Sequence, residues 1–140
     1  MKVTPYTFIE HTADLGIVVR GKDLQNLFET AAMALTSLLV NGKSKQKPTI
    51  GRIIVTADDI DDLMVRWLSE ILYLFEGDGE VVTGVTIPKI LPSHLEAEVK
   101  KVPFDRALYE IQYEIKAVTY HQIDVSEKKD HWEARIIFDV

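Results

Sequence analysis

The chain has 140 residues, of which 46% are hydrophobic and 27% are charged, a size and composition typical of one globular domain. Sixteen Lys and Arg residues against 22 Asp and Glu residues give a net charge of −6. Such a balance repels a phosphate backbone, so direct nucleic-acid binding is not expected. The sequence contains no cysteine, which excludes disulfides, thiolate zinc sites and cysteine nucleophiles.

Neither a signal peptide nor a membrane span is expected, because the longest unbroken apolar run covers only residues 71–75, far short of a bilayer crossing. No repeat or linker divides the sequence, so residues 1–140 are predicted to form a single domain. The expected location is the cytoplasm, and no membrane partner is expected.

The N-terminal part predicts two strands and a helix. Residues 6–10 and 15–19 are β-type runs separated by the polar stretch His11-Thr12-Ala13-Asp14. A helix follows with Asp23 as its N-cap, and Asn41-Gly42 are predicted to end it because both tolerate left-handed backbone. Its apolar residues recur at helical spacing: Leu24, Leu27, Phe28, Ala31, Ala32, Leu35, Leu38 and Leu39.

A short basic cluster precedes the next strand. Lys43, Lys45 and Lys47 stand among Gly42, Ser44 and Pro48, which is typical of a solvated loop. A strand is then predicted over residues 51–57.

The acidic pair Asp58-Asp59 begins a second predicted helix, which Gly77-Asp78-Gly79 ends. Its apolar stripe consists of Ile60, Leu63, Met64, Trp67, Leu68, Ile71, Leu72 and Phe75. Four acids occur between residues 58 and 62, and the helix dipole stabilises negative charge at a first turn without any metal.

From residue 80 onwards the period of the apolar pattern is two. It predicts strands over residues 80–87, 95–102, 111–124 and 131–139, with breaks at Pro88, Pro92, Pro103 and residues 126–130. The whole pattern predicts an α+β fold, with two amphipathic helices packed on one largely antiparallel sheet. A mixed sheet stays open, because a helix can connect parallel neighbours.

Two features of the sequence offer carboxylates. Asp14 lies in a predicted loop between two strands. It either has a functional role or bonds the backbone of the turn, and its spacing alone favours the second alternative. Asp139 and the carboxylate of Val140 end the last predicted strand. If Asp14 approaches them, three carboxylates offer oxygen ligands to a hard cation; a solvated tail is the alternative.

A third feature is the predicted strand Lys116-Ala117-Val118-Thr119-Tyr120-His121. Alternation places Lys116 and Tyr120 on one face and His121 on the other. Lys116 and Tyr120 can contact an anion, and His121 can move a proton near neutral pH. The alternative is that Tyr120 is an amphipathic rim residue and Lys116 a surface cation.

Four separated blocks carry a wider pattern. They are Glu10-His11-Thr12-Ala13-Asp14-Leu15-Gly16-Ile17, Trp67-Leu68-Ser69-Glu70-Ile71-Leu72-Tyr73-Leu74-Phe75, Lys116-Ala117-Val118-Thr119-Tyr120-His121, and Trp132-Glu133-Ala134-Arg135 ahead of the final Phe138-Asp139-Val140. In order and spacing, the blocks resemble the archease family. The sequence departs from the family at Gln122, where a glycine is expected after the histidine.

The resemblance implies an accessory protein and not an enzyme. Archeases assist the RtcB-type tRNA-splicing RNA ligase: they promote guanylylation of the ligase histidine by GTP and so restore multiple turnover in tRNA splicing and RNA repair. For this sequence the resemblance implies a divalent-cation site at Asp14, Asp139 and Val140, with Ca²⁺ preferred and Mg²⁺ or Mn²⁺ as alternatives. Secondary functional candidates are His11, Lys116, Tyr120 and His121.

Two other functions stay open at this point. One is a metal-dependent phosphohydrolase that uses the same carboxylates, although the sequence has no recognised nucleophile motif. The other is a general chaperone or modulator of nucleic-acid-processing proteins. The oligomeric state cannot be inferred from the sequence.

Overall fold

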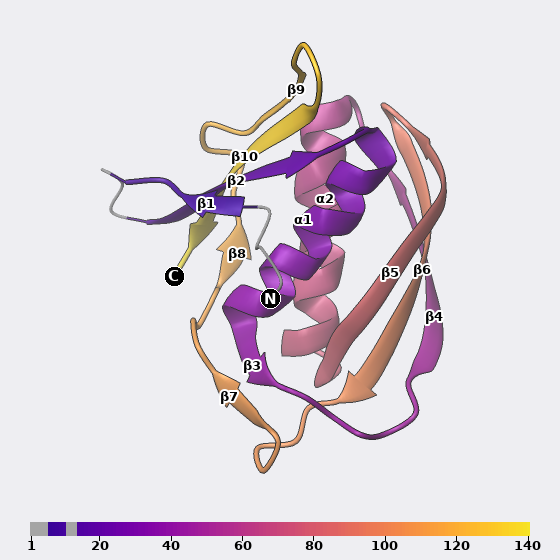
Figure 1. Ribbon diagram of the computed structural model, residues 1–140, viewed down its shortest axis with the longest axis vertical. Helices are drawn as coiled ribbons and strands as arrows, with labels where there is room; N and C mark the ends of the chain where they lie inside the picture. The colour runs from indigo at the N-terminus through magenta and orange to yellow at the C-terminus, as the bar shows by residue number, and fades with distance from the viewer. Residues whose placement is uncertain (1–5, 11–13) are drawn as a thin grey trace.

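The computed structural model describes residues 6–10 and 14–140 (Figure 1). Helix α1 (Leu24–Leu39) begins as predicted, because Asp23 is extended and its carboxylate accepts a hydrogen bond from the Asn26 backbone N–H at 2.7 Å. Helix α2 (Ile60–Glu76) begins in the same way at Asp59, which accepts from the Asp62 N–H at 2.8 Å. The predicted N-cap Asp23 and the predicted start of the second helix at Asp58-Asp59 are therefore confirmed.

The end of α1 differs from the prediction. Val40 is already extended, and β3 (Val40–Gly42) follows at once and pairs with β7 (Tyr109–Ile111). Asn41 and Gly42 therefore belong to a strand and do not close the helix. Gly42 has a φ of +144°, and a Cβ there would lie 2.1 Å from the Leu108 carbonyl oxygen, so the close approach of the two chains requires glycine.

The strands form two larger sheets besides this two-stranded ribbon, and every pairing described is antiparallel. The first sheet contains β1 (Tyr6–Phe8), β2 (Leu15–Gly21), β10 (Trp132–Asp139), β8 (Ala117–Val118) and β9 (Asp124–Glu127). The second has the order β4 (Thr49–Thr56), β6 (His94–Pro103), β5 (Glu80–Leu91).

The two helices lie between these sheets (Figure 1). Helix α1 contacts β2 and β10 on one side and β5 on the other, while α2 contacts β8 and β9 on one side and β4 and β5 on the other. The predicted α+β class, with two helices on antiparallel sheet, is confirmed. In place of the one predicted sheet there are two larger sheets and a two-stranded ribbon, because the buried residues of each helix span more than one face.

Residues 111–124 do not form the single predicted strand. The N–H groups of Gln112 and Tyr113 instead donate to the Leu39 and Leu38 carbonyls at 3.0 and 3.1 Å, so they satisfy the last turn of α1. Only Ala117–Val118 then joins a sheet, before a turn leads to β9.

Pro88 also does not end its strand as predicted. Strand β5 continues to Leu91 because it is an edge strand, where a missing N–H is tolerated, and its register shifts between Thr86 and Lys89.

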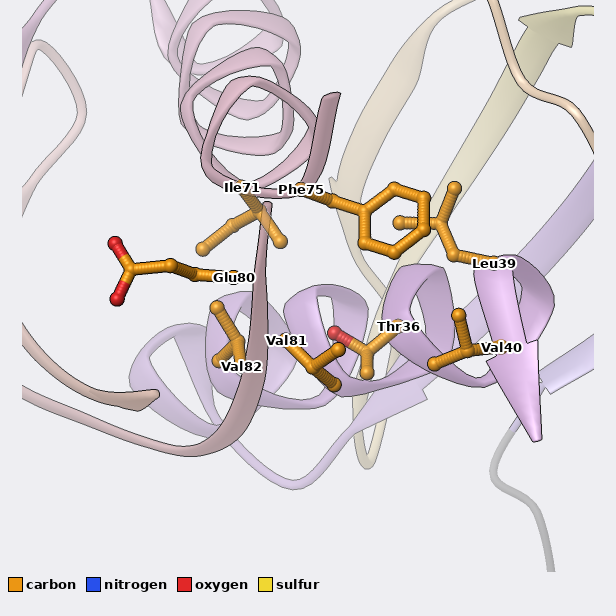
Figure 2. Close-up of a pocket in the computed structure, with 8 residues that line it drawn as sticks. All are labelled: Thr36, Leu39, Val40, Ile71, Phe75, Glu80, Val81 and Val82. Atoms are coloured by element: carbon orange, nitrogen blue, oxygen red, sulfur yellow. The ribbon is translucent and has the colours of Figure 1, made fainter. Parts of the chain in front are cut away.

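The ends of both helices meet the start of β5 in a closed apolar junction (Figure 2). The residues that converge there are Thr36, Leu39, Val40, Ile71, Phe75, Glu80, Val81 and Val82. The space between them does not admit a water molecule, and the Glu80 carboxylate points away from it (Figure 2) to pair with Lys101 at 2.8 Å. This junction is packed core and not a ligand site.

Within residues 6–10 and 14–140, neither helix is long and apolar enough to cross a membrane.

Candidate functional site

Asp14 and Asp139 lie at the same end of two paired strands. Leu15, the first residue of β2, pairs with Phe138, the penultimate residue of β10. Asp14 directly precedes this pair in one strand and Asp139 directly follows it in the other. The antiparallel register, continued by one residue, sets the two aspartates opposite each other. Both are exposed.

The two aspartates belong to the face of this sheet that points away from the helices. Phe138, Ile136 and Ile17 alternate with them and are fully buried against the helices. Val140 follows Asp139 and is 45% exposed. The three residues predicted to hold a cation are thus brought to one exposed end of the sheet.

Lys116 joins the same end through its backbone. Its N–H donates to the Asp139 carbonyl oxygen at 2.7 Å, and the next residue, Ala117, pairs with Asp139 in the ladder. Lys116 also lines a surface hollow of about 460 Å³ together with Phe75 and Tyr113. Lys116 therefore lies beside Asp139 and near the C-terminal end of α2.

The strand ends are held by apolar packing on the outer face. Ile137 is buried there, and the Ile9 N–H donates to the Gly16 carbonyl at 2.8 Å. A Cβ on Gly16 would lie 2.8 Å from the Ile137 Cδ1 and 3.2 Å from the Ile9 Cβ. Gly16 thus lets Ile9 and Ile137 pack over the sheet, with Gly16 and Ile137 each two residues along their strands from an aspartate.

Tyr120 and His121 do not share this arrangement. The Tyr120 hydroxyl donates to Asp62 Oδ1 at 2.6 Å, on the first turn of α2, and the exposed His121 lies in a turn where its N–H donates to Thr119 Oγ1 at 3.2 Å. Tyr120 therefore binds the loop to α2. His11, the remaining candidate, lies outside the described residues.

The acids at the start of α2 have a role that their spacing did not reveal. Asp61 Oδ1 accepts from the Val125 N–H at 2.7 Å, and Asp62 accepts from Tyr120, from the Asp58 N–H and from Arg66. The bonds from Val125 and Tyr120 link residues about 60 positions apart in the sequence, and no local signal predicts them. The Tyr120 hydrogen bond is the main reason that the pKa of Asp62 is lowered, and the same bond raises the pKa of Tyr120.

The lowered pKa of Asp62 gives a pH-dependent prediction. Asp62 stabilises the fold above its ordinary pKa of 3.8, and this contribution is lost as the pH falls through the lower folded value. Tyr120→Phe removes the largest cause of the shift. We expect wild-type protein to lose more stability than Tyr120→Phe between about pH 5 and pH 2, measured by urea unfolding.

Tyr73→Phe is the matched control, because Tyr73 is an exposed tyrosine on α2. If the free energy of unfolding of Tyr120→Phe fell with pH as much as that of wild type, the Tyr120 hydrogen bond would not be the main cause of the lowered Asp62 pKa.

Gln122 occupies a backbone position suited to glycine. Its φ is +54°, and it is the only non-glycine residue with positive φ in the described part of the chain. We expect Gln122→Gly to raise the free energy of unfolding by about 0.5–1 kcal/mol, because the release of left-handed strain outweighs the added freedom of the unfolded chain. Thermal denaturation checks this; a lower melting temperature would contradict it.

The donor chemistry of Asp14, Asp139 and Val140 fits a hard divalent cation, because carboxylate oxygens at an open strand end are the ligands that Ca²⁺, Mg²⁺ and Mn²⁺ prefer. In the part of the chain that the structure describes, no group of three or more His, Asp or Glu side chains lies placed to hold a metal ion. The predicted set has a different composition, two aspartates and the Val140 carboxylate, so it stays a prediction.

Comparison with known proteins identifies the family of the chain. The chain matches the archease protein family (MTH1598/TM1083) over residues 6–140. It is 33% identical to protein archease of Methanosarcina acetivorans over 139 residues, which cover 96% of this chain and 95% of the relative. It is also 33% identical to protein archease of Pyrococcus furiosus over 136 residues, with 94% and 95% covered.

Two solved structures share the fold. The solution structure of protein 1598 from Methanobacterium thermoautotrophicum has a TM-score of 0.75 and 26% identity, and covers 99% of this chain and 100% of the other. The crystal structure of an archease from Thermotoga maritima, described as a possible chaperone, has a TM-score of 0.64 and 20% identity, with 94% of each chain covered. Since the family match extends from the first described strand to Val140, the chain belongs to the archease protein family.

Proposed function

We propose that this archease is an accessory protein that activates an RtcB-type tRNA-splicing RNA ligase. It promotes GTP-dependent guanylylation of the ligase histidine and so sustains multiple turnover. Asp14, Asp139 and Val140 would hold a divalent cation for this step, with Ca²⁺ preferred and Mg²⁺ or Mn²⁺ as alternatives. The protein works in the cytoplasm and does not carry out the ligation itself.

The observation that supports this proposal is the pairing of Leu15 with Phe138, which brings Asp14 and Asp139 to one exposed end of the sheet. An exposed end of two paired strands can enter a partner's active site, which a buried cluster cannot do. The backbone bond from Lys116 to Asp139 adds a cation-bearing residue beside the carboxylates, suited to contact a phosphate.

The charge of the protein supports a protein partner. A net charge of −6 favours association with a basic, RNA-binding ligase over binding to RNA, because opposite potentials steer two proteins together. Within such a complex, the aspartates hold the cation and Lys116 orients phosphate oxygens near the histidine that is guanylylated. The cation supplies charge neutralisation at the triphosphate.

The test is guanylylation of the cognate ligase by GTP, with and without this protein. We expect faster guanylylation and more than one ligation per ligase molecule only when the protein is present. Unchanged rates in both assays, with complex formation shown separately, would overturn the proposal.

A second candidate function comes from the Thermotoga maritima archease, which is described as a possible chaperone. A chaperone is expected to suppress aggregation of unrelated proteins, and this activity should survive substitution of Asp14 and Asp139. Suppression that is retained in both variants, without any effect on the ligase, would favour this function.

A further inference from the structure

Strand β4 is an unprotected edge of the three-stranded sheet. In the part of the chain that the structure describes, it pairs with β6 alone, and the register is unbroken from Thr49 to Thr56. The opposite edge, β5, carries Pro88 and two register shifts. Proline and bulges are common protections against edge-to-edge pairing, and β4 has neither within its length.

Alternate residues of β4 direct their backbone groups away from the sheet. The Ala57 N–H donates to the Ser93 carbonyl at 2.9 Å, one step beyond the pair Thr56 and His94. Bonds to β6 therefore fall on odd-numbered residues, and by antiparallel alternation the N–H and C=O groups of the even-numbered residues point outward. Four residues have this orientation: Ile50, Arg52, Ile54 and Thr56.

The same edge exposes large apolar side chains. Ile50 is 67% exposed and Ile54 is 55% exposed, on the face of the sheet that points away from α2. Arg52 lies between them and pairs with Glu96 at 3.1 Å. Two isoleucines at these positions favour strand pairing and are poor residues for a solvated edge.

Charges of opposite sign flank β4. Lys43, Lys45 and Lys47 precede it, and four acids follow it between residues 58 and 62. An antiparallel copy of the same strand reverses this order, so the lysines of each copy lie beside the acids of the other. A two-fold axis forms this contact between lysines and acids at both ends of the strand pair. The charges therefore favour a second copy of this chain as the partner of β4.

We propose that β4 pairs antiparallel with β4 of a second copy, about a two-fold axis at Ile53, and so joins the two three-stranded sheets into one. In this register Arg52 lies opposite Ile54 of the second copy and Ile50 lies opposite Thr56. Each residue whose backbone N–H and C=O groups point away from the sheet thus lies opposite another such residue. The two Arg52 side chains are not directly opposite each other.

The space beside β4 fits this arrangement. A hollow of about 320 Å³ lies between β4 and α2, lined by Ile54, Arg66, Ser69, Glu70 and neighbouring β4 residues. In the proposed register Gly51 of the second copy lies opposite Val55, so the second strand would approach this hollow without a bulky inner-face side chain. The aspartates at the end of β2 and β10 belong to the other sheet, so the dimer leaves the candidate metal site open.

Sedimentation equilibrium of the full chain tests the proposal. We expect a reversible dimer, and we expect Ile54→Lys, at an exposed position, to be monomeric with an unchanged circular dichroism spectrum. The double variant Lys45→Glu/Lys47→Glu should weaken dimerisation at least about tenfold. Lys128→Glu/Lys129→Glu, which changes net charge equally in an exposed loop, is the matched control and should dimerise as wild type does.

Cross-linking locates the interface, because the chain has no natural cysteine. A short bismaleimide should join two copies of Arg52→Cys and leave Arg135→Cys, on the other sheet, monomeric. A wild-type chain that is monomeric up to about 100 µM would overturn the proposal. Equal cross-linking of the two cysteine variants would also overturn it. The proposal would fail as well if β4 paired only with a protein of different sequence.

Discussion

Asp139→Asn is expected to abolish stimulation of the ligase and to leave the fold intact. Asp139 is exposed at the end of β10, and its ladder contacts are made by the backbone, so an amide changes charge without changing the strand. An amide oxygen is a weaker ligand for a hard cation than a carboxylate. We expect multiple-turnover ligation to fall to the level without archease, with the free energy of unfolding within about 0.5 kcal/mol of wild type.

Asp14→Asn should have the same effect, and the double variant should be no worse than either single variant. Two ligands of one cation act as a unit, so their losses are not additive. Isothermal titration with Ca²⁺, Mg²⁺ and Mn²⁺ should show binding to wild type and none to either variant.

Asp78→Asn is the matched control, because Asp78 is an exposed aspartate in the turn after α2. It should bind metal and stimulate the ligase as wild type does. Additive losses of stimulation in the Asp14 and Asp139 double variant would contradict a shared site, and full stimulation by both single variants would remove the aspartates from the mechanism.

Features that depend on neighbouring residues were predictable from the sequence. Asp23 and Asp59 cap helices through hydrogen bonds to N–H groups three residues away, and this short range appears directly in the sequence. The last strand was predictable for a similar reason: Ala134, Ile136 and Phe138 share one face and are fully buried, while Glu133, Arg135 and Asp139 lie on the other.

Features that depend on distant pairing were not predictable. The end of α1 is set by β7, about 70 residues later in the sequence, and the segment after β7 donates to α1 in preference to forming a strand. The alternating pattern of residues 111–124 contains no information about these partners. Tertiary contacts therefore override local propensity there.

The candidate site combines both kinds of information. The resemblance to archeases named Asp14 and Asp139, but no local pattern explains why residues 125 positions apart meet. The pairing of β2 with β10 provides that reason. For Tyr120 the prediction from sequence and the structure differ. It was a candidate for the same site, but its hydroxyl donates a hydrogen bond to Asp62 on α2.

Trp67→Ala is expected to cause the largest loss of stability of the substitutions considered. Trp67 is fully buried on α2, and its indole Nε1–H donates to the Phe28 carbonyl of α1 at 2.9 Å. Truncation removes this bond between the helices and leaves a cavity at the centre of the layered core. Losses for a buried aromatic residue are about 3–5 kcal/mol, a large share of the roughly 5–15 kcal/mol of a typical domain.

Trp67→Phe separates the two contributions, because phenylalanine keeps most of the buried apolar surface and loses the donor. We expect it to cost about 1–3 kcal/mol, less than alanine, in urea unfolding followed by circular dichroism. Trp132→Phe, at a half-buried position at the start of β10, should cost less than either. If Trp67→Ala were no more costly than Trp132→Phe, the two helices would not depend on Trp67 for their packing, and the core between the two sheets would be held mainly by the sheets themselves.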